Sequence, residues 1–205
     1  MLIRSAKSAG GFTILEAMIT LTVLAILTVI AVPNMRTWIV NNKVRGVADA
    51  LQNGLRLAQT ESLRRSRQVV FVFTDTTTPT AIPLAAAAGA SSWAMYTVPS
   101  IAGEIPQFIQ SGELSNASTG VTVASAPATA ALCFNSAGRL VGNPNASVTA
   151  ITGGVGCNQP VGPQQFAIAA ASGGDRPLQV TLGLGGQVHM CDPNVAISDS
   201  HPEGC

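Results

Sequence analysis

A single carboxylate at the edge of a long uncharged stretch has the clearest chemical potential in this sequence. Glu16 is followed by residues 17–35, in which no side chain carries a charge. A carboxylate at the depth of a lipid bilayer is costly, so such a group is by default functional and needs a partner. The blander interpretation places Glu16 among lipid headgroups at the end of an ordinary anchor. We favour a charged partner, and the amine of a chain cut before Phe12 is the obvious cation.

Four cysteines form the second set of reactive side chains, and all of them lie beyond residue 130. An even number of cysteines behind an apolar segment suggests disulfides in an oxidising compartment. Sequence alone allows three pairings, of which we prefer the two local ones, Cys133 with Cys157 and Cys191 with Cys205. A disulfide that closes the C-terminal loop is favoured over the competing interpretation, which is a zinc site made from His189, Cys191, His201 and Cys205.

Other residues of catalytic type do not form a convincing active site. Ser198, Asp199 and His201 are of nucleophile, acid and base type, but they stand in a polar terminal loop without a nucleophile-elbow sequence. The glycine-rich stretch 183–186 lacks the lysine and the following helix pattern of a phosphate-binding loop, so it predicts a turn. The sequence therefore predicts a protein that is not an enzyme, with no catalytic residue, no metal and no cofactor.

The apolar stretch needs a helix to position it, and its length suits one that crosses a bilayer, which takes about 20 mostly apolar residues. In front of it, residues 1–11 hold Arg4 and Lys7 and no acid. A cleaved secretory signal fits poorly, since the stretch is too long and no convincing small-x-small site follows it before Pro33. Basic flanks stay in the cytoplasm, which directs the rest of the chain to the periplasm.

Beyond Pro33 the same helix is predicted to continue to about Ser66, because apolar residues recur at three- and four-residue steps. This stripe consists of Val40, Val44, Val47, Leu51, Leu55 and Ala58. Pro33 removes one backbone donor, so a kink or a loosened turn is expected there rather than a break. The predicted organisation is a leader (1–11), a transmembrane helix (12–35), its amphipathic continuation (36–67) and a head (68–205).

The head is predicted to consist of short β-strands. The strongest run is 68–74, and weaker ones lie at 93–97, 107–110, 120–124, 131–135, 165–171, 178–183 and 187–191. Segment 76–92, with two prolines and an alanine run, is predicted to be a loop or a disordered segment. Segment 142–165, rich in glycine, asparagine and proline, is predicted to be largely loop. The predicted fold is α+β, in which a long N-terminal helix, transmembrane in its first half, packs by its second half against an antiparallel β-sheet head.

The net charge of +1 hides an asymmetry between the helix and the head. Residues 36–67 carry seven basic and two acidic side chains, whereas residues 68–205 carry two basic and seven acidic ones. A basic helix joined to an acidic head can associate with its neighbours. Nucleic acid is not an expected partner, because a binder would need a basic stripe on the head. We interpret the basic cluster at 64–67 as a solvated helix end whose cations offset the macrodipole, in preference to a DNA or lipid site.

Residues 11–16 read Gly-Phe-Thr-Ile-Leu-Glu, behind a short basic leader and ahead of an apolar helix. This pattern resembles the class III signal of type IV pilins and type II secretion pseudopilins. The resemblance implies that prepilin peptidase cuts after Gly11 and that Phe12 becomes the N-methylated N-terminus. It also implies that Glu16 is the acidic residue used in assembly, and Pro33 falls where many family members carry a helix-weakening proline.

Within that group, three pieces of the head resemble the GspH/FimT family: the strand directly after the helix, Cys-Phe-Asn-Ser-Ala-Gly-Arg-Leu at 133–140, and Gly-Gly-Gln-Val-His-Met-Cys-Asp-Pro at 185–193. The resemblance implies a minor pilin or minor pseudopilin. Some FimT-like proteins carry Gly-Arg-x-Arg before the C-terminal cysteine, a feature linked to DNA binding. Residues 186–189 depart from it as Gly-Gln-Val-His, so a role in DNA uptake is not expected.

The function implied is that of a structural subunit of a type IV pilus or a type II secretion pseudopilus. The alternative is a binding module at the pilus tip, an adhesin or DNA-uptake receptor on the same anchor. The partners implied are other minor and major pilins or pseudopilins, prepilin peptidase, an inner-membrane assembly platform and, before assembly, the inner membrane. The expected location is a single pass through that membrane, with a cytoplasmic N-terminus and a periplasmic head, and later the filament.

Overall fold

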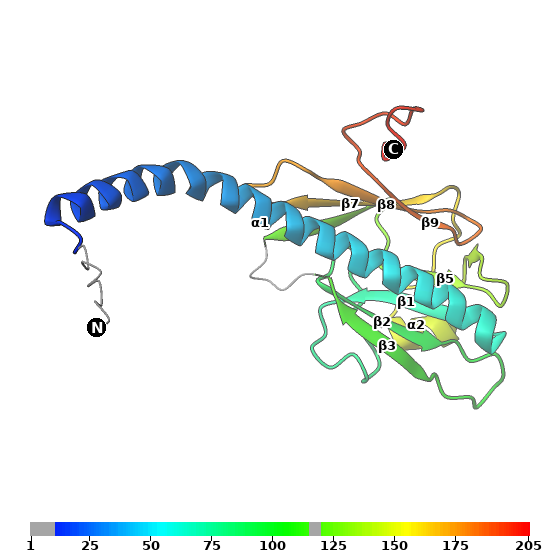
Figure 1. Ribbon diagram of the computed structural model, residues 1–205. Helices are drawn as coiled ribbons and strands as arrows, with labels where there is room; N and C mark the ends of the chain where they lie inside the picture. The colour runs from blue at the N-terminus through cyan, green and yellow to red at the C-terminus, as the bar shows by residue number, and fades with distance from the viewer. Residues whose placement is uncertain (1–10, 115–119) are drawn as a thin grey trace, which may run out of the picture.

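The computed structural model describes residues 11–114 and 120–205, and it consists of one long helix and a β-rich head (Figure 1). The elements follow one another as α1 (Ile14–Arg65), β1 (Val69–Thr74), β2 (Ser92–Thr97), β3 (Phe108–Glu113), β4 (Val121–Ala126), β5 (Ala131–Phe134), β6 (Leu140–Val141), α2 (Ala146–Thr152), β7 (Gln164–Ala170), β8 (Leu178–Leu182) and β9 (Val188–Cys191). The predicted α+β class is confirmed.

Helix α1 has well-formed signals at both of its ends. Thr13 is the N-cap, and its hydroxyl oxygen accepts a hydrogen bond from the Glu16 N–H at 3.2 Å. At the other end Ser66 takes a left-handed conformation (φ 50°), and the Arg67 N–H donates to the carbonyl of Ser62. The helix is continuous through Pro33. The predicted bounds of the helix are thus confirmed, whereas a kink at Pro33 stays a prediction.

The strands form two antiparallel sheets. The first has the order β3-β2-β1-β5-β6, and the second has the order β4-β7-β8-β9. The predicted hairpin between the last two strands is confirmed, with Leu182 opposite Val188 and the turn closed by the Gly183 N–H donating to the Gln187 carbonyl at 2.9 Å. The division into two sheets was not visible in the sequence, because the residue pattern of a short strand does not show which sheet it joins.

Strand β1 is buried on both faces. Because neither face meets water, residues 69–73 form an unbroken apolar run instead of an alternating one. Phe71 and Phe73 belong to the cluster beneath α1, whereas Val70 and Val72 belong to a second cluster on the opposite face of the same sheet. The first sheet is therefore the middle layer of the head, with helix α1 on one side.

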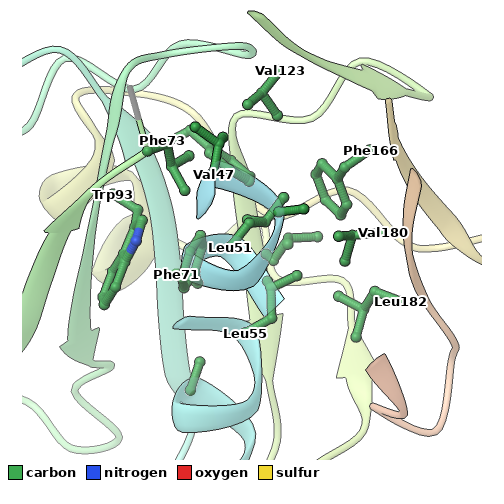
Figure 2. Close-up of a cluster of buried hydrophobic side chains, with 14 of the residues drawn as sticks. Val47, Leu51, Leu55, Phe71, Phe73, Trp93, Val123, Phe166, Val180 and Leu182 are labelled. Carbon is green, nitrogen blue, oxygen red and sulfur yellow. The ribbon is translucent and has the colours of Figure 1, made fainter. Parts of the chain in front are cut away.

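The main core lies where the second half of α1 crosses both sheets (Figure 2). Leu51 and Leu55 point from the helix into the space between Phe71 of the first sheet and Phe166 and Leu182 of the second. All five side chains are completely buried. Burial of one such side chain contributes roughly 1.5–3 kcal/mol, so this stripe fixes the helix to the head.

One contact in this core requires glycine on the helix. The indole ring of Trp93 stacks on Phe71 with 5.1 Å between ring centroids. A Cβ atom added at Gly54 would lie 2.9 Å from Cε2 of Trp93. Gly112 on β3 is closer still, since a Cβ atom there would lie 2.6 Å from Cζ2 of the same ring. The ring therefore occupies the space of two absent side chains.

The expectation that residues 142–165 are largely loop is wrong in part, because α2 forms within them. Its composition is rich in β-branched residues and favours helix only weakly. Val148 and Ile151 are completely buried against the far face of the first sheet, beside the Cys133–Cys157 disulfide. The Leu84 N–H also donates to the Ile151 carbonyl at 2.7 Å. Tertiary packing, rather than local propensity, makes this helix.

No helical segment among the residues that the structure describes reaches the length and apolarity of a membrane span.

Candidate functional site: the uncovered half of the long helix

The first half of α1 stands free of the head (Figure 1). Its large apolar side chains are exposed. Leu24 is 60% exposed, whereas Leu51, three-quarters of the way along the same helix, is completely buried. The large exposed side chains of this region, which we name the uncovered half, are Phe12, Ile14, Leu15, Met18, Ile19, Leu21, Val23, Leu24, Ile26, Leu27, Val29, Val32, Met35, Trp38 and Ile39.

Threonine hydroxyls do not make this surface polar, because their hydrogen bonds are internal to the helix. The Thr22 hydroxyl donates to the Met18 carbonyl at 2.6 Å, and the Thr28 hydroxyl donates to the Leu24 carbonyl at 2.6 Å. Hydroxyls bonded in this way need no water or lipid headgroup as a partner. The uncovered half is therefore suited to an apolar environment over its whole circumference.

The expected cleavage position lies just outside the helix. Gly11 and Phe12 precede the N-cap and are exposed, and the Phe12 ring is 82% exposed. Residues 1–10 of the expected leader lie outside the described residues. A peptide bond between two exposed residues that belong to no helix or strand is accessible to a peptidase, so the position is compatible with processing.

Glu16 lies in the first turn of α1, exposed, where the positive pole of the helix dipole favours a carboxylate. Thr13 and Glu16 have the spacing of a capping box, a signal that the sequence interpretation overlooked. Only half of the box is formed, since the Glu16 N–H bonds to the Thr13 hydroxyl. Within residues 11–114 and 120–205 the Glu16 carboxylate has no hydrogen-bond or ion-pair partner. Its oxygens are thus available to a neighbouring molecule.

The opposite end of α1 is polar and internally paired. Glu61 accepts hydrogen bonds from Arg64 at 2.7 Å and from Arg65 at 2.7 Å. These bonds, Arg64 first, lower the pKa of the Glu61 carboxyl below its usual range. Arg67 forms an ion pair with Glu104 in the loop between β2 and β3. All three cations of 64–67 are ion-paired within the chain, and the interpretation of this cluster as a solvated helix end stays a prediction.

The four cysteines form two disulfides in the head, in the local pairing that the sequence favoured. Cys133 is joined to Cys157, and Cys191 is joined to Cys205. The first ties β5 to the segment behind α2. The second joins two cysteines 14 positions apart and closes the C-terminal loop onto β9. Because Cys191 and Cys205 are bonded to each other, they do not supply the thiolates of the alternative zinc site.

The remaining polar residues of the C-terminal loop form an exposed turn. His201 Nδ1 lies 3.1 Å from a Glu203 carboxylate oxygen, and the His201 N–H donates to the Ser198 hydroxyl at 3.2 Å. His189 lies on β9 with its side chain exposed. Among the described residues no group of three or more metal-ligating side chains comes together. The structure thus brings Gly11, Phe12 and Glu16 together at the N-terminal end of the uncovered half and joins the four cysteines in two disulfides.

Comparison with known proteins adds a family and two similar folds. The family model described as type II transport protein GspH matches residues 47–186 of the chain. The type IV minor pilin FimU of Pseudomonas aeruginosa is similar, with 15% identity, 77% of this chain and 97% of FimU covered, and a TM-score of 0.49. The minor pseudopilin EpsH from the type 2 secretion system of Vibrio cholerae is similar too, with 13% identity, 75% of this chain and 99% of EpsH covered, and a TM-score of 0.47.

None of the curated proteins compared with the chain matches it. The GspH match spans the covered half of α1, β1 to β8 and the turn into β9, which is more than half of the sequence. It therefore includes the helix–sheet core and both cysteines of the first disulfide. The chain belongs to the GspH family and is a GspH/FimT-like pilin.

Proposed function

We propose that this chain is a minor subunit of a type IV pilus or of a type II secretion pseudopilus, and that it assembles through the uncovered half of α1. The observation that carries the proposal is the contrast within one helix between a fully covered and a fully uncovered apolar stretch. Fifteen large apolar side chains between Phe12 and Ile39 are exposed. Each is worth roughly 1.5–3 kcal/mol when buried, so water is not their working environment.

Two environments meet this need in succession. Before assembly, the lipid of the inner membrane surrounds the uncovered half, with the leader in the cytoplasm and the head in the periplasm. After assembly, the corresponding helices of neighbouring subunits replace the lipid. The exchange is favoured by packing and by polar pairing rather than by escape from water, since lipid and protein interior are similarly apolar.

Glu16 supplies the polar pairing in this proposal. Prepilin peptidase cuts after Gly11 and leaves a methylated amine on Phe12, four residues ahead of the carboxylate. The pairing of that amine with Glu16 of the adjacent subunit compensates two costly charges at once. Because an ion pair of this kind has a short range, it also fixes the axial position of one helix against the next.

The test is Glu16→Ala in the full chain, with Glu113→Ala on the exposed edge of the head as the matched control. The Glu16 variant is expected to be processed and inserted normally, to keep its thermal stability, and to disappear from sheared filaments or from the purified pseudopilus. The control is expected to assemble like the wild type. Recovery of the Glu16 variant in the filament at wild-type level would contradict the pairing.

Two deletion phenotypes distinguish the filaments. Loss of twitching motility with normal secretion identifies a pilus subunit, whereas loss of secreted hydrolases with normal motility identifies a pseudopilus subunit. A Gly11→Val variant adds an independent check on processing, because the uncleaved chain is expected to remain longer by eleven residues and to stay in the membrane fraction.

A further inference from the structure

A groove lies where α1 leaves the head, beside the loop between β7 and β8 (Figure 1). We name residues 171–177 the junction loop and this recess the junction groove. The residues that line the groove are Thr28, Val29, Val32, Arg36 and Thr37 of α1 and Gly173 of the junction loop. Val29 is 75% exposed and Val32 is 41% exposed. The groove therefore combines an apolar wall with one cation, because Arg36 is the only charged residue among the described residues that line it.

The junction loop is held against α1 by contacts on both sides of its tip. The Asn41 amide donates to the Asp175 carboxylate at 2.6 Å, and the Asp175 N–H donates to the Asn41 side-chain oxygen at 3.2 Å. A Cβ atom added at Gly174 would lie 3.0 Å from Cγ1 of Val40, so the backbone of the loop lies very close to the helix. The wall that Gly173 contributes to the groove is thus already formed, which lowers the entropy that binding would cost.

The charge of Arg36 is not neutralised within the described parts of the chain. Arg36 is exposed and forms no ion pair there. The acidic residues at this end of the head line a second groove, which also includes Arg45 and Arg176, and they are Asp175, Asp192 and Glu203. None of these acids is among the described residues that line the junction groove. The junction groove is therefore suited to an anionic group joined to an apolar chain.

The length of the uncharged stretch places this groove at a membrane boundary in the proposed function. Residues 17–35 rise about 28 Å at 1.5 Å per residue, and the hydrocarbon core of a bilayer is about 30 Å thick. Arg36, the first charged residue beyond this stretch, then lies at the periplasmic boundary. Val40, beside the junction loop, is about 6 Å farther along and falls within the headgroup layer, which is about 5–8 Å thick on each side. Trp38, 67% exposed, lies between them, at the depth where indole rings are enriched.

We propose that the junction groove binds one phospholipid of the periplasmic leaflet while the chain is in the membrane. The Arg36 guanidinium holds the phosphate of the headgroup, to which it can donate two parallel hydrogen bonds. An acyl chain of the same lipid follows Val32 and Val29 into the bilayer. The bound lipid sets the depth of α1 and keeps the junction loop against the headgroups. The inference rests on the proposed function and names a ligand for one face of the uncovered half before assembly.

The direct test counts the phospholipids that the full chain retains. The chain is inserted into vesicles of phosphatidylethanolamine and phosphatidylglycerol, extracted in mild detergent and analysed by native mass spectrometry. The wild type is expected to keep one phospholipid per chain, and Arg36→Gln is expected to lower the lipid-bound fraction at least fivefold. Arg45→Gln removes the same charge from an exposed arginine of α1 that does not line the junction groove, and it should retain lipid like the wild type. Equal retention by the wild type and Arg36→Gln, or an equal fall in both variants, would overturn the inference.

Filling the groove provides the second measurement. Val32→Trp places an indole ring where the acyl chain is expected and should abolish lipid retention, whereas Val23→Trp adds the same bulk outside the groove and should not. Excess inorganic phosphate should release no lipid, and its release by phosphate alone would overturn the assignment of a phospholipid in favour of a simple anion site.

Flotation of the vesicles separates this inference from the proposed function. A chain that floats with the vesicles but retains no phospholipid refutes the lipid site and leaves the proposed function intact. A full chain that does not insert into the vesicles would instead refute the membrane stage of the proposed function, and the lipid site with it.

Discussion

Both halves of α1 carry large apolar side chains, but these side chains have opposite surroundings. Leu24 and Leu51 are the same residue type in the same helix, yet one is 60% exposed and the other is completely buried. The second half is covered by the chain's own two sheets, whereas the first half leaves its apolar surface for other molecules. The difference shows that an apolar helix stretch contributes to the fold only where the same chain supplies its cover.

Truncation of one leucine in each half should give the largest contrast. Leu51→Ala is expected to lower the free energy of unfolding by about 2–5 kcal/mol, because it leaves a cavity between the two sheets. Leu24→Ala makes the same chemical change on the uncovered half and should alter it by no more than about 0.5 kcal/mol. Urea unfolding of the purified chain in detergent measures both. Equal losses of unfolding free energy in the two variants would show that the uncovered half contributes to the fold as much as the covered half does.

Substitution of two glycines of α1 by alanine should change the stability of the chain in opposite directions. Alanine at Gly54 would place a Cβ atom 2.9 Å from the Trp93 ring, so Gly54→Ala is expected to cost about 1–3 kcal/mol of strain. The higher helix propensity of alanine offsets about 1 kcal/mol of this cost. At Gly46 no such neighbour lies within 4 Å of the place that a Cβ atom would take, so Gly46→Ala should stabilise the chain by up to about 1 kcal/mol. Thermal unfolding monitored by circular dichroism distinguishes a fall from a rise.

Loss of the N-cap should affect only the uncovered end. Thr13→Ala removes the acceptor of the Glu16 N–H and should cost about 1 kcal/mol locally. Amide hydrogen exchange in detergent is expected to quicken several-fold in the first turn, while global unfolding changes little because the head does not contact this turn. Thr20→Ala, whose hydroxyl only donates to the Ala17 carbonyl, is the control. If Thr13→Ala lowered the free energy of global unfolding as much as it destabilises the first turn, the uncovered half would contribute to the stability of the head, which would contradict the prediction.

The smallest expected effect is a pH dependence at the far end of the covered half. The hydrogen bond from the Ser100 N–H, aided by Arg67, holds the pKa of Glu104 below its usual range. A lowered native pKa contributes stability above the pH at which the unfolded carboxyl titrates, and this is lost as the pH falls through the native pKa. Between about pH 5 and pH 3 the wild type should therefore lose more stability than Glu104→Gln. Parallel melting curves of the two chains over this range would contradict the assignment.

Features with a local signal were predictable from the sequence. The uncharged apolar stretch and the three-and-four spacing of the stripe behind it predicted a helix whose observed ends lie within one residue of the predicted ones. The strands at 69–74 and 92–97 and the hairpin at 183–186 were found because runs of β-branched and aromatic residues and turn residues are also local signals. The local disulfide pairing agrees because each bridge joins segments that the strands already bring together.

Features that depend on distant contacts were not predictable. Helix α2 has a poor helical composition and forms because Val148 and Ile151 fill the far face of the first sheet. The exposure of Ile101 and Ile105 in the loop between β2 and β3 gave no signal either, since both residues have the same apolar type as residues of the core. The division of the strands into two sheets likewise depends on distant contacts, because the covered half of α1 packs against both sheets in one core.

The continuity of α1 from its cap to Ser66 determines which way the head faces. Because no break separates the two halves, any movement of the uncovered half along a neighbour is transmitted to the head as a screw motion. A slip of a single residue shifts the head by about 1.5 Å and turns it by about 100°. The small axial error would be tolerable, but the rotation would point the head toward a different side of the filament. One correctly placed charge at Glu16 would then control the azimuth of the whole head.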